Sequence, residues 1–278
     1  MSNFFKQFPT VGYDFDRNGI LQNMTDIFRH VKPLDNFIDN SLGYRFYEIQ
    51  DGERPDIVSQ KLYGTPSYYW TFFVVNERLH DGYREWPMSQ IDFSEYLDKK
   101  YEGVAIIPGR PSVTTNTDGI VLSSNNSLGG RFTIGEKIRG QVSNAEGTLV
   151  QKNVDMHQVV LQNVTGNFLG DETGLSSVEE IKGLSSADIV DTYKVYNYID
   201  APYQYYDSSD TEKKAVSYSN AFQNTSSGRE NTVDEANIKF ISNRQHENEK
   251  NEARSFIRYI SPQYIQEFVR KYENLINE

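Results

Sequence analysis

Residues 44–77 read YRFYEIQDGERPDIVSQKLYGTPSYYWTFFVVNE, and this stretch decides the fold class. Its first residues, 44–49, alternate and are rich in aromatic side chains, which predicts a β-strand, and an Asp-Gly turn follows at 51–52. Pro55 and Pro66 each suit the first position of a helix, because the missing N–H costs nothing there. The pattern predicts a strand followed by two helices that are too short to persist alone.

The ends of these helices carry further signals. Thr65 is a good N-cap for the second helix, whereas Arg54 is a poor one for the first. Gly64 provides the left-handed residue that ends the first helix. A third, better-capped helix is expected over 89–100, and the apolar run at 104–107 is a candidate strand. The sequence thus predicts a β-α-α-β module near residues 44–107.

The composition divides the chain into four parts. Residues 1–43 are interrupted by Pro and Gly, which predicts an extended N-terminal arm with one brief helix or turn. The β-α-α-β domain is assigned to 44–110. Residues 111–190 are rich in Gly and Ser with short β-type runs, which predicts an inserted small β-barrel-like module, although irregular loops have a similar composition. Residues 191–278 contain the C-terminal strand and amphipathic helix region, so the whole chain is expected to be α+β.

Two patterns in the second half of the chain add detail. Residues 130–136 (GRFTIGE) recur in part at 166–172 (GNFLGDE), which is a weak internal repeat of the inserted module. Residues 253–260 alternate as a strand, and Ser261-Pro262 then starts the clearest helix of the chain. Its apolar stripe, which must be buried on something, consists of Ile265, Phe268, Val269, Tyr272 and Ile276.

The bulk composition excludes several classes of function. The chain has no cysteine, so it has no disulfide framework and no thiolate zinc site. Its formal charge of −11 repels a phosphate backbone, so nucleic acid is not expected as a partner. The first 25 residues lack an apolar run of signal-peptide length, and no stretch approaches the ~20 apolar residues needed to cross a bilayer. We therefore expect no membrane partner.

The polar motifs do not form a catalytic or cofactor pattern. The four histidines are not spaced as ligand pairs. Residues 14–19 follow the order of an EF-hand loop, but Thr25 stands where the glutamate would be, so an Asx-rich turn is the preferred interpretation over a calcium site. Four neighbouring carboxylates suggest either a glycosidase pair or a solvated turn, and we favour the turn: Glu48, Asp51, Glu53 and Asp56. We expect no enzyme activity, no catalytic residues, no cofactor and no metal.

Aromatic side chains are the unusual feature of the composition. The 19 Tyr and 16 Phe could be half-exposed strand residues, or they could form extensive contact surface. In the second helix they cover more of the circumference than one small core requires, so part of them should face a partner; alternatively, the inserted module or the terminal helix covers them. The candidate protein-interface residues are Tyr68, Tyr69, Trp70, Phe72, Phe73 and Trp86.

Residues 44–77 resemble a LysM module, and more specifically the LysM-like baseplate wedge subunit of T-even-type contractile-tailed bacteriophages, the gene product 53 family. Four details carry this resemblance: Pro55-Asp56 after the turn, Lys61-Leu62-Tyr63-Gly64, the Tyr-Trp pair at 69–70, and Trp86-Pro87-Met88. Residues 249–269 also look like the family's closing strand and helix. The Gly-rich region of 111–190 departs from the shorter family members, so its role does not carry over.

The resemblance implies a structural protein of the virion. Such a subunit joins adjacent wedges and helps to assemble the baseplate around the central hub. Its implied partners are other wedge proteins, neighbouring wedges and hub or sheath-proximal tail proteins, with multiple copies in a sixfold assembly. Its implied location is the tail baseplate, after assembly in the host cytoplasm. The alternatives are a LysM-type peptidoglycan-binding protein associated with a cell-wall hydrolase, and an adaptor of a cellular contractile injection system.

Overall fold

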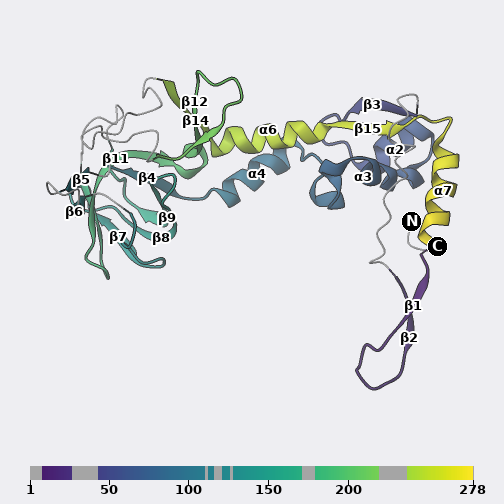
Figure 1. Cartoon of the computed structure of the whole chain (residues 1–278), viewed down its shortest axis with the longest axis horizontal. Helices are drawn as coiled ribbons and strands as arrows, with labels where there is room; N and C mark the ends of the chain where they lie inside the picture. The colour runs from purple at the N-terminus through teal and green to yellow at the C-terminus, as the bar shows by residue number, and fades with distance from the viewer. Residues whose placement is uncertain are drawn as a thin grey trace. The chain divides into compact units, whose positions relative to one another are not determined.

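The computed structural model describes residues 8–26, 43–109, 112–115, 121–125, 128–170, 179–218 and 237–277 (Figure 1). The chain forms two compact units: unit 1 contains residues 1–93 and 249–278, and unit 2 contains residues 94–248. Both helices and strands are present, so the predicted α+β class is confirmed. Across the described ranges, no helix is both long enough and apolar enough to span a membrane.

The described part of the N-terminal arm is a β-hairpin. Strands β1 (Thr10–Tyr13) and β2 (Gln22–Thr25) are antiparallel, with Val11 opposite Met24. Phe8, just before β1, is buried in the same core cluster as Trp70. The base of the hairpin is therefore fixed to unit 1 by an apolar side chain. The rest of the predicted arm, 1–7 and 27–42, lies outside the described residues.

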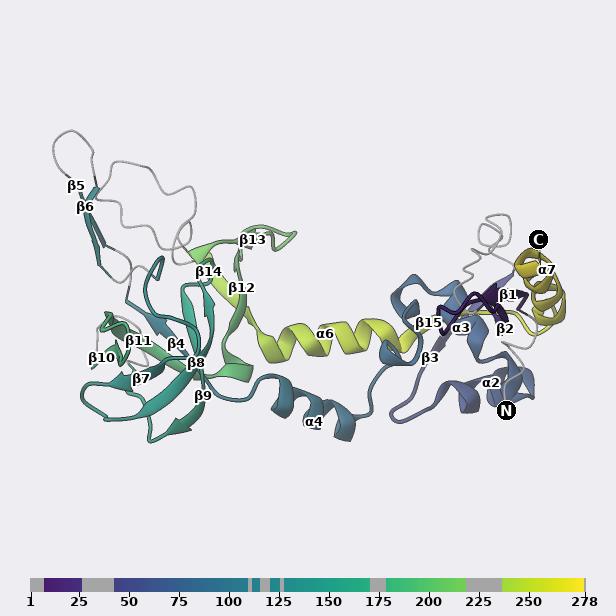
Figure 2. The same ribbon diagram turned by 90° about the horizontal axis from the view of Figure 1, so that it is seen from below.

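The centre of unit 1 is a two-stranded antiparallel sheet with two helices between its strands in sequence order. The order is β3 (Tyr44–Glu48), α2 (Pro55–Tyr63), α3 (Trp70–Val75) and, much later in the chain, β15 (Phe256–Ile260). Figure 2 shows β3 and β15 side by side. The strand that closes the β-α-α-β order is therefore β15, whereas the apolar run at 104–107, the expected closing strand, belongs to unit 2.

The local signals explain where these helices begin and end. Arg54 provides no side-chain cap to α2, and Gly64 ends that helix with φ 73°. The Thr65 hydroxyl accepts a hydrogen bond from Ser67 N–H at 3.3 Å. The expected second helix is split, because Pro66 opens a 3-10 turn, η2 (Pro66–Tyr68), before α3 begins.

Further elements complete unit 1. Two 3-10 turns, η3 (Glu77–Leu79) and η4 (Gly82–Arg84), lead to α4 (Gln90–Lys100), in which the chain passes into unit 2. The chain returns within α6 (Asn243–Ser255), so the strand predicted over 253–260 begins later, at Phe256. The last helix is α7 (Ile265–Asn277), which buries Ile265, Phe268, Tyr272 and Ile276, as the apolar stripe predicts.

Unit 2 is built on a closed six-stranded barrel with the strand order β10-β11-β4-β9-β8-β7. Its strands are β4 (Val104–Pro108), β7 (Lys137–Gly140), β8 (Glu146–Asn153), β9 (Gln158–Thr165), β10 (Glu179–Gly183) and β11 (Ile189–Asn197). The barrel thus extends beyond the predicted module of 111–190, because β4 precedes that range and most of β11 follows it. Strands β4 and β11, at the two borders of that range, pair with each other, and β7 pairs with β10 to close the barrel.

Two equivalent glutamates hold the barrel's hairpin turns. The buried Glu136 carboxylate accepts hydrogen bonds from Ser185 and Ser186 N–H, and the buried Glu179 carboxylate accepts them from Val142 and Ser143 N–H. Glu136, just before β7, thus binds the turn between β10 and β11, and Glu179, at the start of β10, binds the turn between β7 and β8. Phe132 and Phe168 of the predicted repeat both lie in the barrel core. Glu172, which the repeat aligned with Glu136, lies outside the described residues, and Glu179 has the equivalent contacts.

Unit 2 contains further elements besides the barrel. They are the hairpin β5 (Ser112–Thr115) and β6 (Val121–Asn125), the turn η5 (Tyr198–Asp200), and the sheet of β12 (Pro202–Asp207), β13 (Ala215–Val216) and β14 (Ile238–Ser242). Within unit 2, the buried Glu247 carboxylate accepts hydrogen bonds from Lys100 at 2.7 Å and from the Tyr101 hydroxyl at 2.9 Å. This ion pair joins the end of α4 to the start of α6.

Candidate protein-interaction surface

Three of the six predicted interface residues lie in the core of unit 1. Phe72 is 0% exposed, and Trp70 and Trp86 are each 7% exposed. Tyr68, Tyr69 and Phe73 are half-buried. Burial removes Trp70, Phe72 and Trp86 from the candidate surface, because a side chain without access to solvent cannot meet a second protein in this conformation.

The terminal helix covers the second helix, which is one of the two alternatives left open by the sequence. The Trp70 ring centre lies 5.1 Å from that of Tyr272 and 6.4 Å from that of Phe268, both on α7. Phe268 and Tyr272 are themselves stacked at 6.0 Å. Trp70 is therefore covered by α7, whereas Phe72 and Phe73 pack against Trp86 in a second core cluster.

A smaller aromatic surface remains beside η4. Tyr83, which sequence reasoning did not select, is 60% exposed. Its ring centre lies 5.8 Å from that of Tyr69 and 5.4 Å from that of Phe73. Phe73 in turn contacts Trp86 at 5.9 Å. Of the predicted interface residues, Tyr69 and Phe73 thus contact the exposed ring of Tyr83 and form this surface together with it.

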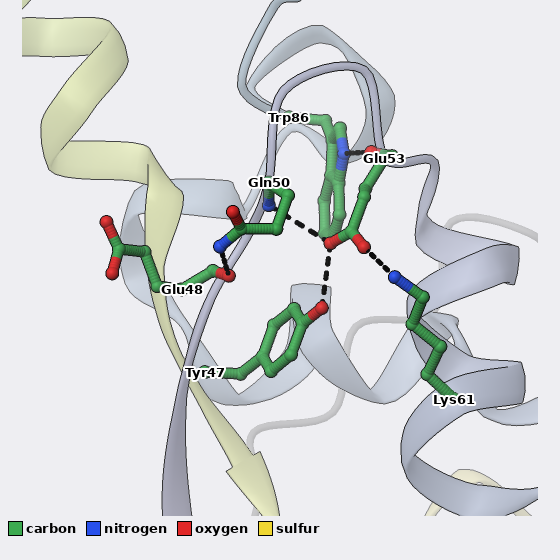
Figure 3. A network of polar contacts seen from close by, with 6 residues as sticks. All are labelled: Tyr47, Glu48, Gln50, Glu53, Lys61 and Trp86. Carbon is green, nitrogen blue, oxygen red and sulfur yellow. Dashed lines mark hydrogen bonds and ion pairs between the residues drawn. The ribbon is translucent and has the colours of Figure 1, made fainter.

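The turn after β3 is fixed by a polar network around Glu53 (Figure 3). Its carboxylate accepts hydrogen bonds from the Tyr47 hydroxyl at 2.8 Å and from Gln50 N–H at 3.0 Å, and it forms an ion pair with Lys61. The Glu53 carbonyl accepts a hydrogen bond from Trp86 Nε1 at 2.6 Å. Glu53 thus connects β3, α2 and the segment after η4.

This network determines the charge state of Glu53. Burial on its own would raise the pKa of the carboxyl, but the hydrogen bonds from Lys61, Gln50 and Tyr47 outweigh it and lower the pKa. A general acid of a glycosidase needs the opposite shift. Asp51 accepts a hydrogen bond from Gln90 N–H at 2.8 Å, and Asp56 lies 3.2 Å from Arg54. These carboxylates therefore lie in a turn, as predicted, but Glu53 is buried among structural partners and is not solvated.

An exposed aromatic pair lies on the outer face of the two-stranded sheet. Phe46 of β3 is 61% exposed and Phe256 of β15 is 59% exposed, yet their rings stack at 5.2 Å and 8°. The pair borders a groove of about 310 Å³, which we call the aromatic groove. It is lined by Phe46, Asn76, Glu77, Arg78, Leu79, Ala253, Arg254, Phe256, Ile257 and Arg258. Sequence reasoning missed this surface, because its two halves are about 200 residues apart.

The N-terminal hairpin exposes a second apolar surface. Val11, Tyr13 and Met24 share one face, because Val11 is opposite Met24 and Tyr13 lies two positions along the same strand. They are 47%, 56% and 42% exposed, respectively. The loop between the strands adds three more exposed apolar residues: Phe15 68%, Ile20 64% and Leu21 69%. Contiguous exposed apolar side chains mark interaction sites.

The hairpin loop contains the EF-hand-like residues of the sequence. The Asp14 carboxylate accepts hydrogen bonds from Asn18 N–H at 3.0 Å and from Gly19 N–H at 2.8 Å. Asn18 in turn accepts one from Ile20 N–H at 2.9 Å. Asp14 and Asn18 thus form an Asx-rich turn, which is the preferred interpretation. Across the residues that the structure describes, no group of three or more His, Cys, Asp or Glu side chains is placed to hold a metal ion.

Apolar side chains exposed on a small sheet and on a hairpin are typical of a surface that docks on other proteins. Residues 1–112 match the family described as base plate wedge protein 53. Baseplate wedge protein gp53 of Enterobacteria phage T4 is 32% identical over 103 residues, which cover 36% of this chain and 51% of that protein. The chain thus aligns with about half the length of this relative.

The match of residues 1–112 confirms that the N-terminal part of the chain resembles the base plate wedge protein 53 family, as the sequence indicated. The match includes the β1–β2 hairpin, β3, α2 and α3. It ends at residue 112, just after β4, so most of the barrel and all of β15 and α7 lie beyond it.

Proposed function

We propose that this chain is a non-catalytic structural subunit of a phage tail baseplate wedge. The observation that carries this proposal is the match of residues 1–112 to a baseplate wedge family. The exposed apolar residues of the hairpin and of the β3–β15 sheet support it, because such surfaces are costly on a free monomer and useful in an assembly.

Unit 1 provides a LysM-like framework for this role. The β-α-α-β order of β3, α2, α3 and β15, with β3 and β15 antiparallel, supports the LysM-like assignment. Baseplate wedge proteins are assembly components, so this module docks on protein and not on glycan. A LysM-type peptidoglycan-binding role is supported by neither the comparisons nor the contacts of the carboxylates.

The partners follow from the same role. The hairpin and the aromatic groove contact other wedge proteins, and the chain joins adjacent wedges around the central hub in several copies of a sixfold assembly. Unit 2, whose barrel lies mostly beyond the matched region, contacts a neighbouring tail protein particular to this phage. The chain is located in the tail baseplate of the virion. The baseplate that contains it is assembled in the host cytoplasm.

A nonsense mutation in the gene for this chain tests the role. Infected cells should accumulate unjoined wedges and no contractile tails, as seen by electron microscopy of lysates. The intact chain supplied in trans should restore tails, and Glu48→Gln, a substitution at an exposed side chain, should restore them equally. Normal, infectious particles without the chain would contradict the proposal.

A further inference from the structure

The hairpin tip and the aromatic groove have complementary chemistry. The tip presents Phe15 between two acidic residues, Asp14 and Asp16. Asp14 is bound within the loop, and Asp16 is exposed and makes no hydrogen bond or ion pair among the residues that the structure describes. The tip therefore offers an exposed phenyl ring beside a carboxylate that is available to a partner.

The groove offers the opposite charge beside aromatic rings. Three guanidinium groups and one carboxylate, that of Glu77, line it, which is an excess of positive charge on a chain whose net charge is −11. Arg254 is paired with Glu85 at 3.1 Å, and Arg78 donates a hydrogen bond to the Ala253 carbonyl at 3.1 Å. Within the described part of the chain, the Arg258 guanidinium has no hydrogen bond or ion pair. It lies beside the exposed, stacked rings of Phe46 and Phe256.

The backbone around Arg258 is fixed, so the groove is formed before anything binds. The Asn76 side chain accepts a hydrogen bond from Arg258 N–H and donates one to the Arg258 carbonyl, both at 2.8 Å. The groove floor contains Leu79 and Ile257, each 1% exposed. A preformed groove loses little conformational entropy on binding.

We propose that the aromatic groove of one copy of this chain receives the hairpin tip of a second copy. Phe15 packs on the Phe46–Phe256 pair, and the Asp16 carboxylate forms an ion pair with Arg258. This inference rests on the proposed assembly role and names one of the contacts between wedges. Because the two surfaces differ, the contact is head-to-tail, and such contacts close into rings when the rotation between copies allows it.

Cross-linking of the full-length chain tests this pairing, and the absence of native cysteine makes the test specific. One variant carries Ile20→Cys at the hairpin tip, and the other carries Glu77→Cys at the rim of the groove. Both positions are exposed and leave Phe15, Asp16 and Arg258 intact. A short bismaleimide added to the mixture should yield a linked dimer, well above the yield when Ile20→Cys is mixed with Ser208→Cys in unit 2.

Charge exchange identifies the residues that make the contact. Asp16→Arg and Arg258→Glu should each lower the affinity between the two copies about tenfold, since loss of one close interfacial charge pair costs at least about 1.4 kcal/mol. The yield of linked dimer should fall accordingly. The double variant with both changes should regain the linkage. Arg45→Glu, which reverses an exposed charge on β3 outside the groove, should have no effect.

The same cysteine pair in purified virions separates this inference from the proposed function. Linked dimers in tails would support both. Tails that contain the chain, with no linkage above the Ser208→Cys control, would overturn the docking of hairpin in groove and leave the baseplate role intact. Single charge reversals that behave like Arg45→Glu would also overturn it.

Discussion

The Glu53 side chain determines the geometry of the turn between β3 and α2. It accepts hydrogen bonds from a tyrosine hydroxyl and a backbone N–H, and it pairs with Lys61. Its carbonyl also anchors Trp86. Because its side chain is only 9% exposed, loss of the charge would leave several donors poorly satisfied.

We expect Glu53→Gln to lower the free energy of unfolding of unit 1 by about 1–3 kcal/mol, the usual cost of disturbing hydrogen bonds to a charged group. The folded-state pKa of Glu53 lies below its ordinary value of 4.5. Its carboxylate therefore stabilises the fold fully above that value, and this contribution is lost as the pH falls through the folded-state pKa. Urea unfolding of the variant should thus lose part of its acid dependence.

Tryptophan fluorescence measures this effect in unit 1, because both tryptophans, Trp70 and Trp86, lie there. Glu48→Gln is the matched control, since the Glu48 carboxylate is exposed and makes no hydrogen bond within the described part of the chain. Equal unfolding midpoints for the two variants would show that the network does not stabilise the turn.

At the scale of elements, Asn76 takes the place of a third strand beside β15. Its amide satisfies both backbone groups of Arg258 on the free edge of that strand. We expect Asn76→Ala to destabilise unit 1 by about 1–3 kcal/mol, because both groups lose their partner. Asn76→Asp should cost at least as much, since its second carboxylate oxygen would face the Phe72 and Arg258 carbonyl oxygens, to which the Asn76 amide donates. Denaturant unfolding followed by tryptophan fluorescence measures both, with exposed Glu77→Ala as a control that should unfold like the wild type.

A second element-scale prediction concerns the barrel. Glu179→Gln should loosen the turn at 140–145, because the buried carboxylate accepts hydrogen bonds from Val142 and Ser143 N–H. The hydrogen–deuterium exchange rate of the backbone amides in that turn should increase about tenfold or more, because charge-assisted hydrogen bonds worth ~1–3 kcal/mol are lost. The neighbouring exposed Glu180→Gln should exchange like the wild type. Equal protection in the two variants would contradict the role assigned to Glu179.

Local signals predicted several elements correctly. The α2 helix begins at Pro55 and ends before Gly64, and α7 buries the residues of its apolar stripe. Pairing between distant strands was not predictable, because β3 and β15 carry no mark of their partner. The aromatic residues of α3 were placed at an interface, since their number did not reveal that α7 covers Trp70 and that Phe72 packs in the core with Trp86. The sequence of α6 is almost entirely polar, so it has no apolar stripe from which the helix could be predicted.

On the scale of the whole molecule, the chain combines two units with separate cores. Unit 1 contains the aromatic clusters around Trp70 and Trp86, and unit 2 contains the barrel core around Leu149 and Ile181. We therefore expect two unfolding transitions in urea. Tryptophan fluorescence should follow only the first unit, and Glu179→Gln should shift only the transition detected by exchange in the barrel. A single transition seen by both methods would contradict the independence of the units.

As a structural part of the tail baseplate, which is the role that we propose, the chain should be present in every purified virion. Quantitative mass spectrometry of purified virions, combined with chemical cross-linking, measures this. We expect a fixed copy number per tail that is a multiple of six, with cross-links from unit 1 to baseplate wedge proteins. Virions that lack the chain, or that contain it without cross-links to any baseplate protein, would show that it is not a baseplate subunit.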